Sequence, residues 1–450
     1  MNVNALILAA GHGTRMKSDL PKMLHPLLGR PMLQWVIDAC RQAVDGDVAV
    51  VVGPEGDEIR RAMRGDLSYV VQKERLGTAH AAMQAEGTLG DEGLVLVVNG
   101  DLALLTAESL NLLVEKQRSN PGPFTLMSAQ SDEPRGFGRL IRDQEGRLVA
   151  IQEAAHATPE QLAIKELNVG AYCFKAEWLW RHLPALEKSP KGEYYLTDLL
   201  ALAVEQEEPV ASSPVVSLEE TIGINNRLHL AQAERAMRRR VNEAWLEAGV
   251  TMQDPEATYI EAGVELAPDV TLLANCQLTG DTRIGAHSII GPNSMIHDSI
   301  IGERCEVKAS VVEGAVLENE VDIGPYSHMR EGAYLESGVH VGNYGEVKNS
   351  RLARGVKVGH FSYLGDATIG EDVNIGAGTI TCNYDGRQKN PTEIGAGAFI
   401  GSDTMLVAPV KIGANARTGA GAVVTKDVPA GTMAVGIPAR VIRKLSEDNE

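Results

Sequence analysis

A glycine-bearing turn near the start of the chain carries residue types that bind phosphate. The apolar residues 5–10 lead directly into Gly11-His12-Gly13-Thr14-Arg15-Met16. Glycines let backbone N–H groups approach an anion, and the Arg15 guanidinium adds fixed positive charge. The spacing is not G-x-G-x-x-G and no P-loop lysine follows, which argues against dinucleotide binding and against a Walker-type kinase. Taken alone, these residues fit an ordinary strand-to-helix turn about as well as a phosphate site.

A second candidate is the loop at residues 379–393, the one long interruption of a repetitive tract. Its run Cys382-Asn383-Tyr384-Asp385 is rich in hydrogen-bonding groups, which favours a functional loop over a tolerated insertion. The histidines of the tract, at positions 287, 297, 328, 340 and 360, show no compact ligand spacing for zinc. Acyl transfer, the other chemistry typical of such tracts, is therefore favoured over a zinc enzyme.

The first 227 residues must supply the framework that holds the glycine turn. Short β-branched runs, such as residues 47–53 and 94–101, alternate with amphipathic stretches, such as residues 32–43 and 107–117. This alternation predicts an α/β, Rossmann-like domain over residues 1–227 with a mainly parallel sheet. Its functional loops are expected at the carboxyl ends of the strands.

Beyond this half the hydrophobic period changes twice. Residues 228–248 carry apolar side chains at helical spacing before Gly249, which predicts a connecting helix in a linker over residues 228–249. From Ile260 onward aliphatic residues recur every six positions, with slips near 301–311 and later. This period predicts a β-helix of hexapeptide repeats over residues 250–450, with roughly eight or nine triangular coils. Its sites must lie on outer faces, in escaping loops or between subunits.

Composition restricts the function classes. With 42 basic and 60 acidic side chains the formal net charge is -18, which argues against nucleic-acid binding. The five cysteines are scattered and without C-x-x-C spacing, which fits a reducing cytoplasm better than a disulfide framework or a zinc site. No stretch has the length of a signal peptide core or of a membrane span. We expect a cytoplasmic protein that does not associate with membranes.

An ordered set of segments resembles the sugar-phosphate nucleotidyltransferase family. The segments that carry the resemblance are the glycine turn, Pro21-Lys22-Met23-Leu24, Gln72, Leu76-Gly77-Thr78-Ala79-His80, Asn99-Gly100-Asp101, Gly136-Phe137-Gly138-Arg139, Glu153, Asn168-Val169-Gly170, Gly192-Glu193-Tyr194-Tyr195-Leu196-Thr197-Asp198 and Gly223-Ile224-Asn225-Asn226-Arg227. The family departs from this chain at Asn99, where an aromatic residue often stands, and at Ala103, where proline is usual.

The resemblance implies a role for each matched position. The expected nucleotide and sugar contacts are Leu8, Ala9, Ala10, Gly11, Lys22, Gln72, Gly77, Thr78, Asn99, Gly100 and Asp101, with Gly136, Glu153, Asn168 and Asn225. Arg15 and Lys22 would stabilise charge on the phosphates as catalytic residues. Asp101 and Asn225 would hold Mg²⁺, which prefers hard oxygen ligands and keeps several waters.

The second half extends the resemblance to the whole chain. Gly359-His360-Phe361-Ser362-Tyr363-Leu364-Gly365-Asp366, Asn374-Ile375-Gly376-Ala377-Gly378-Thr379 and Cys382-Asn383-Tyr384-Asp385-Gly386 are similar to a bifunctional bacterial family. That family combines glucosamine-1-phosphate N-acetyltransferase with N-acetylglucosamine-1-phosphate uridylyltransferase. The resemblance implies a left-handed parallel β-helix, a homotrimer, and acetyl-CoA, UTP and glucosamine 1-phosphate as substrates. The product, UDP-N-acetylglucosamine, would feed peptidoglycan and lipopolysaccharide precursor synthesis.

The same resemblance assigns the acetyltransfer residues. His360 would be the general base, Arg330 and Lys348 would grip the sugar phosphate, and Tyr363 and Asn374 would position the amino sugar. Asn383 and Tyr384 would contact the amino sugar and acetyl-CoA, and Ala377, Ser402, Ala420 and Arg440 would contact acetyl-CoA. The family often has arginine where Ile437 stands, so Arg440 would take over phosphate binding.

Two alternatives remain open at this point. A single-activity pyrophosphorylase of the ADP-glucose or GDP-mannose kind also appends β-helix coils to such a catalytic domain. Those coils are usually shorter and lack the His360, Lys348 and Asn383-Tyr384 set. A non-catalytic assembly subunit is the other alternative, and the joint presence of Arg15, Lys22, Asp101 and Asn225 argues against it.

Overall fold

The computed structural model describes residues 2–132, 136–154, 157–190 and 192–445. The chain divides into two compact units, Met1–Met237 and Arg238–Glu450. The division falls inside helix α9 (Arg227–Glu247), so each unit includes part of the helix that we expected to connect them. In the first unit the Leu28 amide donates to the Glu234 carboxylate at 3.1 Å. In the second, the Asn242 side chain donates to the carbonyls of Pro255 and Thr258.

The first unit is built on a mixed sheet in the order β11-β7-β10-β6-β1-β4-β5. Strands β6, β1, β4 and β5 run parallel, while β10 runs antiparallel to both β6 and β7. The strand bounds are β1 Val3–Leu8, β4 Val48–Val52, β5 Ser68–Val71, β6 Leu94–Asn99, β7 Phe124–Gln130, β10 Glu166–Lys175 and β11 Ala211–Pro214, with β8 (Arg139–Arg142) paired to β10 and to β9 (Leu148–Gln152). Strand β4 is apolar throughout, and β1 is apolar except for the buried Asn4, because both faces of these strands are covered.

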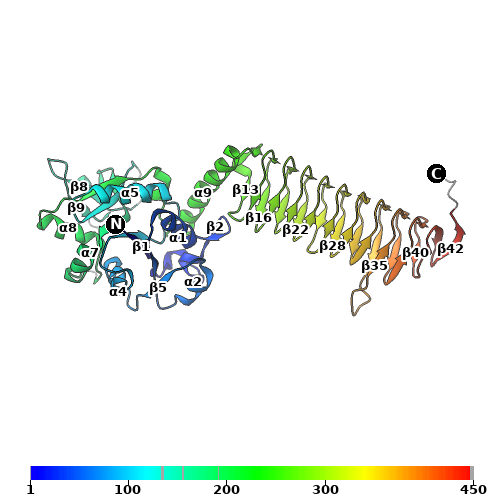
Figure 1. The fold of residues 1–450 in the computed structure, drawn as a ribbon, viewed down its shortest axis with the longest axis horizontal. Helices are drawn as coiled ribbons and strands as arrows, with labels where there is room; N and C mark the ends of the chain where they lie inside the picture. Colours follow the sequence, from blue (N-terminus) through cyan, green and yellow to red (C-terminus); the bar gives the residue numbers. More distant parts are fainter. Residues whose placement is uncertain (1, 133–135, 155–156, 191, 446–450) are drawn as a thin grey trace. The chain divides into compact units, whose positions relative to one another are not determined.

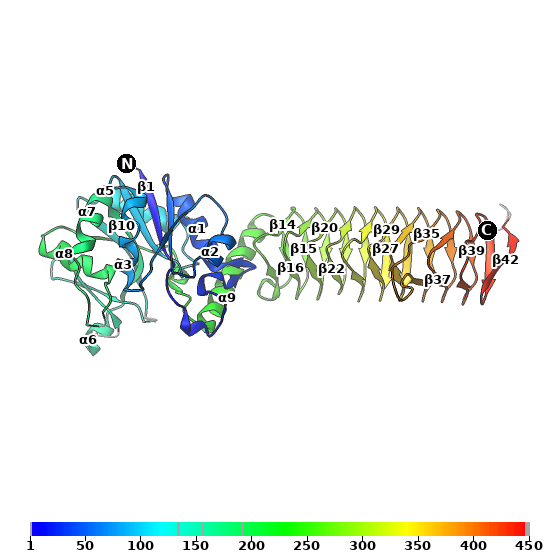
Figure 2. The ribbon, with the colours of Figure 1, turned by 90° about the horizontal axis from the view of Figure 1, so that it is seen from below.

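Helices cover the sheet on two sides, and Figure 2 shows α1 and α7 on opposite sides. The bounds are α1 Met32–Ala43, α2 Asp57–Ala62, α3 Thr78–Met83, α4 Glu86–Leu89, α5 Ala107–Ser119, α6 Pro159–Leu162, α7 Ala176–His182 and α8 Leu199–Glu205. Buried residues of α3, α7 and α8 form one core with the sheet, in which Phe124 lies 4.8 Å from Phe174 and 5.8 Å from Trp178, ring centre to ring centre. The expected α/β architecture is confirmed, and β10 explains why the sheet is not wholly parallel.

The second unit is a left-handed parallel β-helix with three flat faces. Figure 1 shows its strands stacked coil upon coil. Sheet I contains β12 (Thr251–Met252), β15 (Thr271–Leu272), β18 (Ile289–Ile290), β21 (Glu306–Val307), β24 (Asp322–Ile323), β27 (His340–Asn343), β30 (Lys357–His360), β33 (Asn374–Ile375), β36 (Phe399–Ile400), β39 (Arg417–Thr418), β41 (Thr432–Gly436) and the antiparallel β42 (Ala439–Lys444).

Sheets II and III form the other two faces. Sheet II contains β13 (Tyr259–Ile260), β16 (Gln277–Thr279), β19 (Met295–His297), β22 (Val311–Glu313), β25 (His328–Met329), β28 (Glu346–Lys348), β31 (Tyr363–Gly365), β34 (Ile380–Cys382), β37 (Met405–Val407) and β40 (Val423–Val424). Sheet III contains β14 (Glu265–Leu266), β17 (Arg283–Ile284), β20 (Ile300–Ile301), β23 (Val316–Leu317), β26 (Tyr334–Leu335), β29 (Arg351–Leu352), β32 (Ala367–Ile369), β35 (Thr392–Ile394) and β38 (Val410–Ile412). Sheet III has 9 strands in the described part of the chain, and a tenth turn, which contains β39 and β40, closes through a parallel bridge between Ile412 and Val428.

The inward positions explain both the period of six and its slips. The aliphatic residues at period six are buried, and the slips are places where a coil side is one residue shorter but still turns an apolar side chain inward. Ile301, Val307 and Val312 fill the interior across the first slip. In the coil that carries the long loop, the inward residue is Thr381, whose hydroxyl hydrogen-bonds to the Gly365 carbonyl at 3.1 Å. Figure 1 shows this loop leaving the stack just before β35.

Adjacent isoleucines on β20 provide a matched test of this inward stack. Ile301 is 2% exposed and Ile300 is 49% exposed, although both are isoleucines on one strand. We expect Ile301→Ala to destabilise the β-helix by about 2–4 kcal/mol, because it leaves a cavity between coils. We expect Ile300→Ala to change stability by about 0.5 kcal/mol or less. Thermal unfolding of the two variants measures the difference, and equal losses would contradict the inward assignment.

Candidate active sites

A cavity of about 560 Å³ lies at the carboxyl ends of β1 and β6 in the first unit. These two strands are neighbours, and their last residues, Leu8 and Asn99, stand side by side in the register. The cavity gathers many of the positions expected to bind the nucleotide: Leu8, Ala10, Gly11, Arg15, Lys22, Gln72, Gly77, Thr78, Asn99 and Asp101. Ala9 and Gly100 are buried in the same two strand ends, and a side chain at Gly100 would press on the Leu8 carbonyl.

The glycine turn is shaped to admit Lys22. Gly13 has φ 65°, and a Cβ there would lie 2.5 Å from the Lys22 Cβ. The turn continues into two short 3₁₀ segments, η1 (Thr14–Met16) and η2 (Lys22–Leu24), which carry Arg15 and Lys22. Glycine at this position therefore serves both the left-handed backbone and the close approach of the lysine.

Lys22 contacts two of the expected residues and shares one of them with Arg15. Its Nζ donates to Asp101 Oδ2 at 2.7 Å and to Asn225 Oδ1 at 2.9 Å, and the side chain is only 9% exposed. Arg15 donates to the same Asn225 oxygen at 2.8 Å. One carboxylate and one carboxamide oxygen thus converge on a cation. A hard divalent ion takes the same oxygen donors, and Mg²⁺ usually needs few protein ligands because it keeps waters and phosphate oxygens. Asp101 and Asn225 fit that pattern.

The start of α3 and the preceding Gly77 form one wall of the cavity. Gln72 Nε2 donates to the Gly77 carbonyl at 3.1 Å and contacts His80 Nδ1 at 3.0 Å. The Thr78 hydroxyl accepts from the Leu196 amide at 3.0 Å, which ties α3 to residues 192–198 of the first unit. These bonds fix the Gln72 carboxamide at the cavity wall.

A smaller cavity of about 260 Å³ contains the positions expected to bind the sugar. Gly136, Glu153 and Asn168 line it together with Asn99 and Thr78, which it shares with the nucleotide cavity. Tyr172 also lines it and was not expected from the sequence. The two cavities therefore meet along a common wall, as adjoining subsites for a sugar and a nucleotide would.

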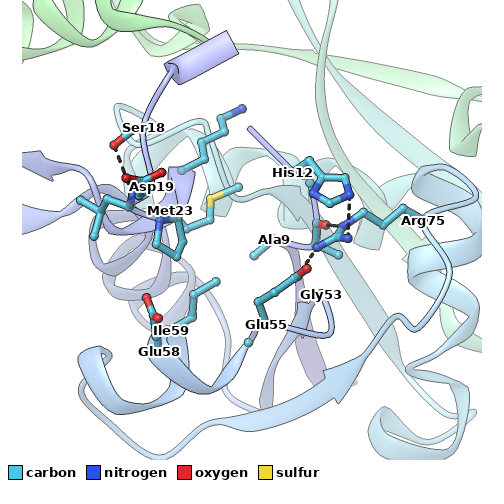
Figure 3. A pocket seen from close by; sticks show the side chains of 16 residues that line it. Ala9, His12, Ser18, Asp19, Met23, Gly53, Glu55, Glu58, Ile59 and Arg75 are labelled. Carbon is cyan, nitrogen blue, oxygen red and sulfur yellow. Dashed lines mark hydrogen bonds and ion pairs between the residues drawn. The ribbon is translucent and has the colours of Figure 1, made fainter. Parts of the chain in front are cut away.

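Arg75 is another residue that sequence reasoning missed. Its Nε donates to the Ala10 carbonyl at 2.7 Å, its guanidinium contacts His12 Nε2 at 2.9 Å, and it pairs with the Glu55 carboxylate. This ion pair lowers the pKa of Glu55 below its ordinary value. Figure 3 shows Arg75 reaching His12 and Glu55 at the wall of an adjoining cavity of about 300 Å³, which shares Gly11, Lys22 and Arg75 with the cavity of about 560 Å³. Arg75 thus holds the end of β1, where several of the expected nucleotide contacts lie.

In the β-helix, His360 ends β30 on sheet I. Its Nδ1 lies 2.8 Å from Asn343 Oδ1, which occupies the matching position on β27. A carboxamide oxygen can only accept, so Nδ1 carries the hydrogen and Nε2 is left as the basic nitrogen. Asn374 lies on β33, which pairs with β30 on the same face. Asn343 was missed from sequence, although its separation from His360 equals one coil.

The expected phosphate-binding cations gather on sheet II. Lys348 ends β28, and Arg330 directly follows β25, where it pairs with Glu346 at 2.8 Å. The pKa of Lys348 is lowered, first by the close approach of the Lys389 side chain and then by the charges of Lys389 and Arg330. Lys389, on the long loop, was not expected. Three cations that repel one another in the free protein form a favourable site for a dianion.

The base of the long loop is tied to the coil through Asp366. Asn383 Nδ2 donates to Asp366 Oδ2 at 2.6 Å and lies 3.4 Å from the Tyr363 hydroxyl. Asn349 donates to the other Asp366 oxygen at 2.6 Å. Tyr384 is exposed and pairs with Lys389 across the loop. The structure thus brings Tyr363 and Asn383 together, and it supplies Asp366 as a missed anchor.

The positions expected to bind acetyl-CoA form a column along one corner. The Ala377 carbonyl accepts from Asp403, the neighbour of Ser402, at 2.6 Å. The Ser402 carbonyl accepts from Gly421, the neighbour of Ala420, at 2.8 Å. Arg440 lies on β42, where it is exposed beside Ile437. Within one chain Arg440 is not in the column, because it belongs to the antiparallel cap of the last coil.

None of the helices formed by the described residues combines the length and apolar character needed to cross a membrane. The same residues contain no cluster of three or more His, Cys, Asp or Glu side chains arranged to hold a metal ion.

Known proteins resemble the chain in both halves. The family model of the MobA-like NTP transferase domain matches residues 5–209, and that of the bacterial transferase hexapeptide (six repeats) matches residues 391–426. The bifunctional protein GlmU of Pelobacter propionicus is 43% identical over 98% of this chain and 97% of its own length. That of Streptococcus equi subsp. zooepidemicus is 44% identical over 98% and 96%.

A solved structure of a UDP-glucose pyrophosphorylase complexed with UDP-glucose matches 53% of this chain with 17% identity and a TM-score of 0.45. The sequence relatives are far closer and extend over both units. With a nucleotidyltransferase unit and a hexapeptide transferase unit in one polypeptide, the chain belongs to the family of bifunctional GlmU enzymes.

Proposed function

We propose that the two cavities and the β-helix surface described above are the two active sites of UDP-N-acetylglucosamine synthesis. Glucosamine 1-phosphate is acetylated by acetyl-CoA at His360, and N-acetylglucosamine 1-phosphate then reacts with UTP beside Asp101. The observation that best supports the second site is the convergence of Asp101 and Asn225 on the Lys22 ammonium. For the first site it is the His360–Asn343 bond, together with the Lys348 and Arg330 cations on the two coils that precede the coil of His360.

In uridylyl transfer, an oxygen of the sugar phosphate attacks the α-phosphorus of UTP and pyrophosphate leaves. The nucleophile is already an anion, so the protein needs to align the reactants and neutralise charge rather than remove a proton. Lys22 and Arg15 are placed to stabilise the phosphates, and the two cavities hold the nucleoside and the sugar. Mg²⁺ held by Asp101 and Asn225 would contribute further charge stabilisation.

In acetyl transfer, the amine of glucosamine 1-phosphate attacks the thioester carbonyl of acetyl-CoA. The new C–N bond forms as the C–S bond breaks, His360 Nε2 takes the amine proton, and coenzyme A leaves with a proton in turn. Asn343 keeps the ring in the tautomer that leaves Nε2 free to act as base. Arg330 and Lys348, with Lys389, would hold the phosphate.

The acetyltransfer residues occupy two faces of the prism, since His360 and Asn374 lie on sheet I and Lys348 and Tyr363 on sheet II. Arg440 lies on the last coil, away from both groups. A cyclic trimer would bring the faces of neighbouring chains together, and we propose this assembly for the acetyltransfer site. A cytoplasmic location is part of the same proposal.

Asp101→Ala tests the uridylyltransfer site. We expect the variant to lose nearly all Mg²⁺-dependent pyrophosphate release from UTP and N-acetylglucosamine 1-phosphate, because it removes one of the two converging oxygens and the partner of Lys22. Acetyl transfer should remain near the wild-type rate. Asp66→Ala, in the same unit but outside both cavities, is the control. Equal loss of both activities in a folded Asp101→Ala protein would contradict separate sites.

His360→Ala tests the general base. We expect acetyl transfer to glucosamine 1-phosphate to fall by about 10²–10⁴-fold, the usual contribution of such a group, with uridylyl transfer unchanged. His340→Ala is the matched control, because His340 lies on the adjacent strand of the same sheet and pairs with Asp322 instead. The rate of acetyl transfer is measured by detecting the thiol of the released coenzyme A with a thiol reagent. A wild-type chain without acetyl transfer would favour a single-activity pyrophosphorylase.

Dilution tests the assembly. We expect sedimentation to show three chains at working concentration, and acetyl transfer per chain to fall when dilution dissociates the trimer. Uridylyl transfer, whose expected residues all lie in one unit, should not change over the same range. A stable monomer with full acetyltransferase activity would refute the shared site.

A further inference from the structure

We propose that Tyr172 is a positioning residue of the sugar cavity: its hydroxyl orients the Asn168 carboxamide so that Oδ1 faces a hydrogen-bond donor on the sugar. The proposal rests on the uridylyltransfer function proposed above and adds a residue to it. It starts from the contact between Asn168 Nδ2 and the Tyr172 hydroxyl, which are 2.8 Å apart.

This contact depends on an irregularity in β10. In a regular strand, residues four apart are separated by about 13 Å along the strand axis. Here the pairing of β10 with β7 shifts register between Asn168 and Tyr172, and Gly170 between them has φ 88°. The irregularity lets the long tyrosine side chain reach back to the asparagine. A side chain at Gly170 would overlap the Asn99 carboxamide, so glycine is required for the backbone and for the space.

Both partners are buried at the wall of the cavity that holds the sugar positions. Asn168 is 6% exposed and Tyr172 is 5% exposed, and both line the cavity of about 260 Å³. The Nδ2 of Asn168 is bonded to Tyr172, whereas its Oδ1 is buried without a hydrogen-bond partner among the described residues. A buried acceptor of this kind is normally satisfied, and Asn168 is one of the residues that line the cavity.

The chemistry of the pair favours a fixed orientation. Burial raises the pKa of Tyr172, and the nearby Glu153 carboxylate raises it further, so the hydroxyl stays neutral across the working range of pH. A carboxamide can present either its oxygen or its NH₂ to a ligand. In this structure Nδ2 donates to the tyrosine hydroxyl, which leaves Oδ1 as the atom of the carboxamide that can accept from a ligand. Substrates that offer an N–H or O–H there are bound, and those that offer only an acceptor are rejected.

The test is a double-mutant cycle on Tyr172 and Asn168. We expect Tyr172→Phe to raise the KM for N-acetylglucosamine 1-phosphate about tenfold, the effect of one lost orienting bond, while the KM for UTP and kcat change little. In an Asn168→Ala background, Tyr172→Phe should have no further effect, because there is no carboxamide to orient. Tyr69→Phe, remote from both cavities, is the control, and acetyl transfer by each variant reports an intact second unit.

Each outcome decides the proposal. An unchanged sugar-phosphate KM in Tyr172→Phe, or an equal rise in the presence and absence of the Asn168 carboxamide, overturns it. If Tyr172→Phe proves too unstable by thermal unfolding, Tyr172→Met, which fills the space without a hydroxyl, carries the same expectation. If the wild-type chain has no uridylyl transfer, the proposed function fails. Calorimetric binding of UDP-N-acetylglucosamine to wild type and Tyr172→Phe then decides the inference, which requires about tenfold weaker binding by the variant.

Discussion

The β-helix depends on one constraint: each coil can bury its apolar side chains only against the coils next to it. The aliphatic residues must therefore recur at the same place in every turn, and parallel hydrogen bonds lock each strand to the strand one coil away. Polar residues one coil apart are then stacked as strictly as the core. His360 lies over Asn343 for this reason, and the Ala377, Ser402 and Ala420 corner forms a column. The repeat that stabilises the unit is also what aligns its chemistry.

The first unit aligns its functional side chains in a different way. A buried cation, Lys22, lies where the ends of neighbouring strands meet. The neighbouring ends of β1 and β6 leave backbone groups and Asp101 around one cavity. Lys22, almost fully buried, satisfies Asp101 and Asn225 together, whose positions in the chain are far apart. A buried charge is tolerated only when paired, so the three residues form a unit in which the loss of any one leaves the others uncompensated. That coupling links the glycine turn to the end of the domain.

Sequence patterns could predict the parts of the structure that repeat or alternate. The period of six places Ile260 and its successors in the core, and one-residue slips such as that before Ile301 do not change which side chains face inward. The resemblance to the nucleotidyltransferase family identified Asp101 and Asn225, the partners of Lys22, as functional residues. No local sequence pattern links these positions to Lys22. Arg75, Lys389 and Tyr172 could not be found in either way. Each acts through a contact set by tertiary register or by a loop that returns to the coil. Asn343 is an exception. Counting back one coil from His360 in the sequence leads to this residue.

One departure of this chain from its family, Asn99, lies at the wall of the cavity of about 260 Å³. Asn99 stands where an aromatic residue is common, and its carboxamide occupies the space that a side chain at Gly170 would fill. Gly170 is also the centre of the irregularity that brings Tyr172 to Asn168. A small polar residue at position 99 leaves the wall of the cavity to be completed from β10, and Tyr172 supplies a ring there. The ring of Tyr172 on β10 therefore lines the same cavity as Asn99, and its hydroxyl accepts from the neighbouring Asn168 amide.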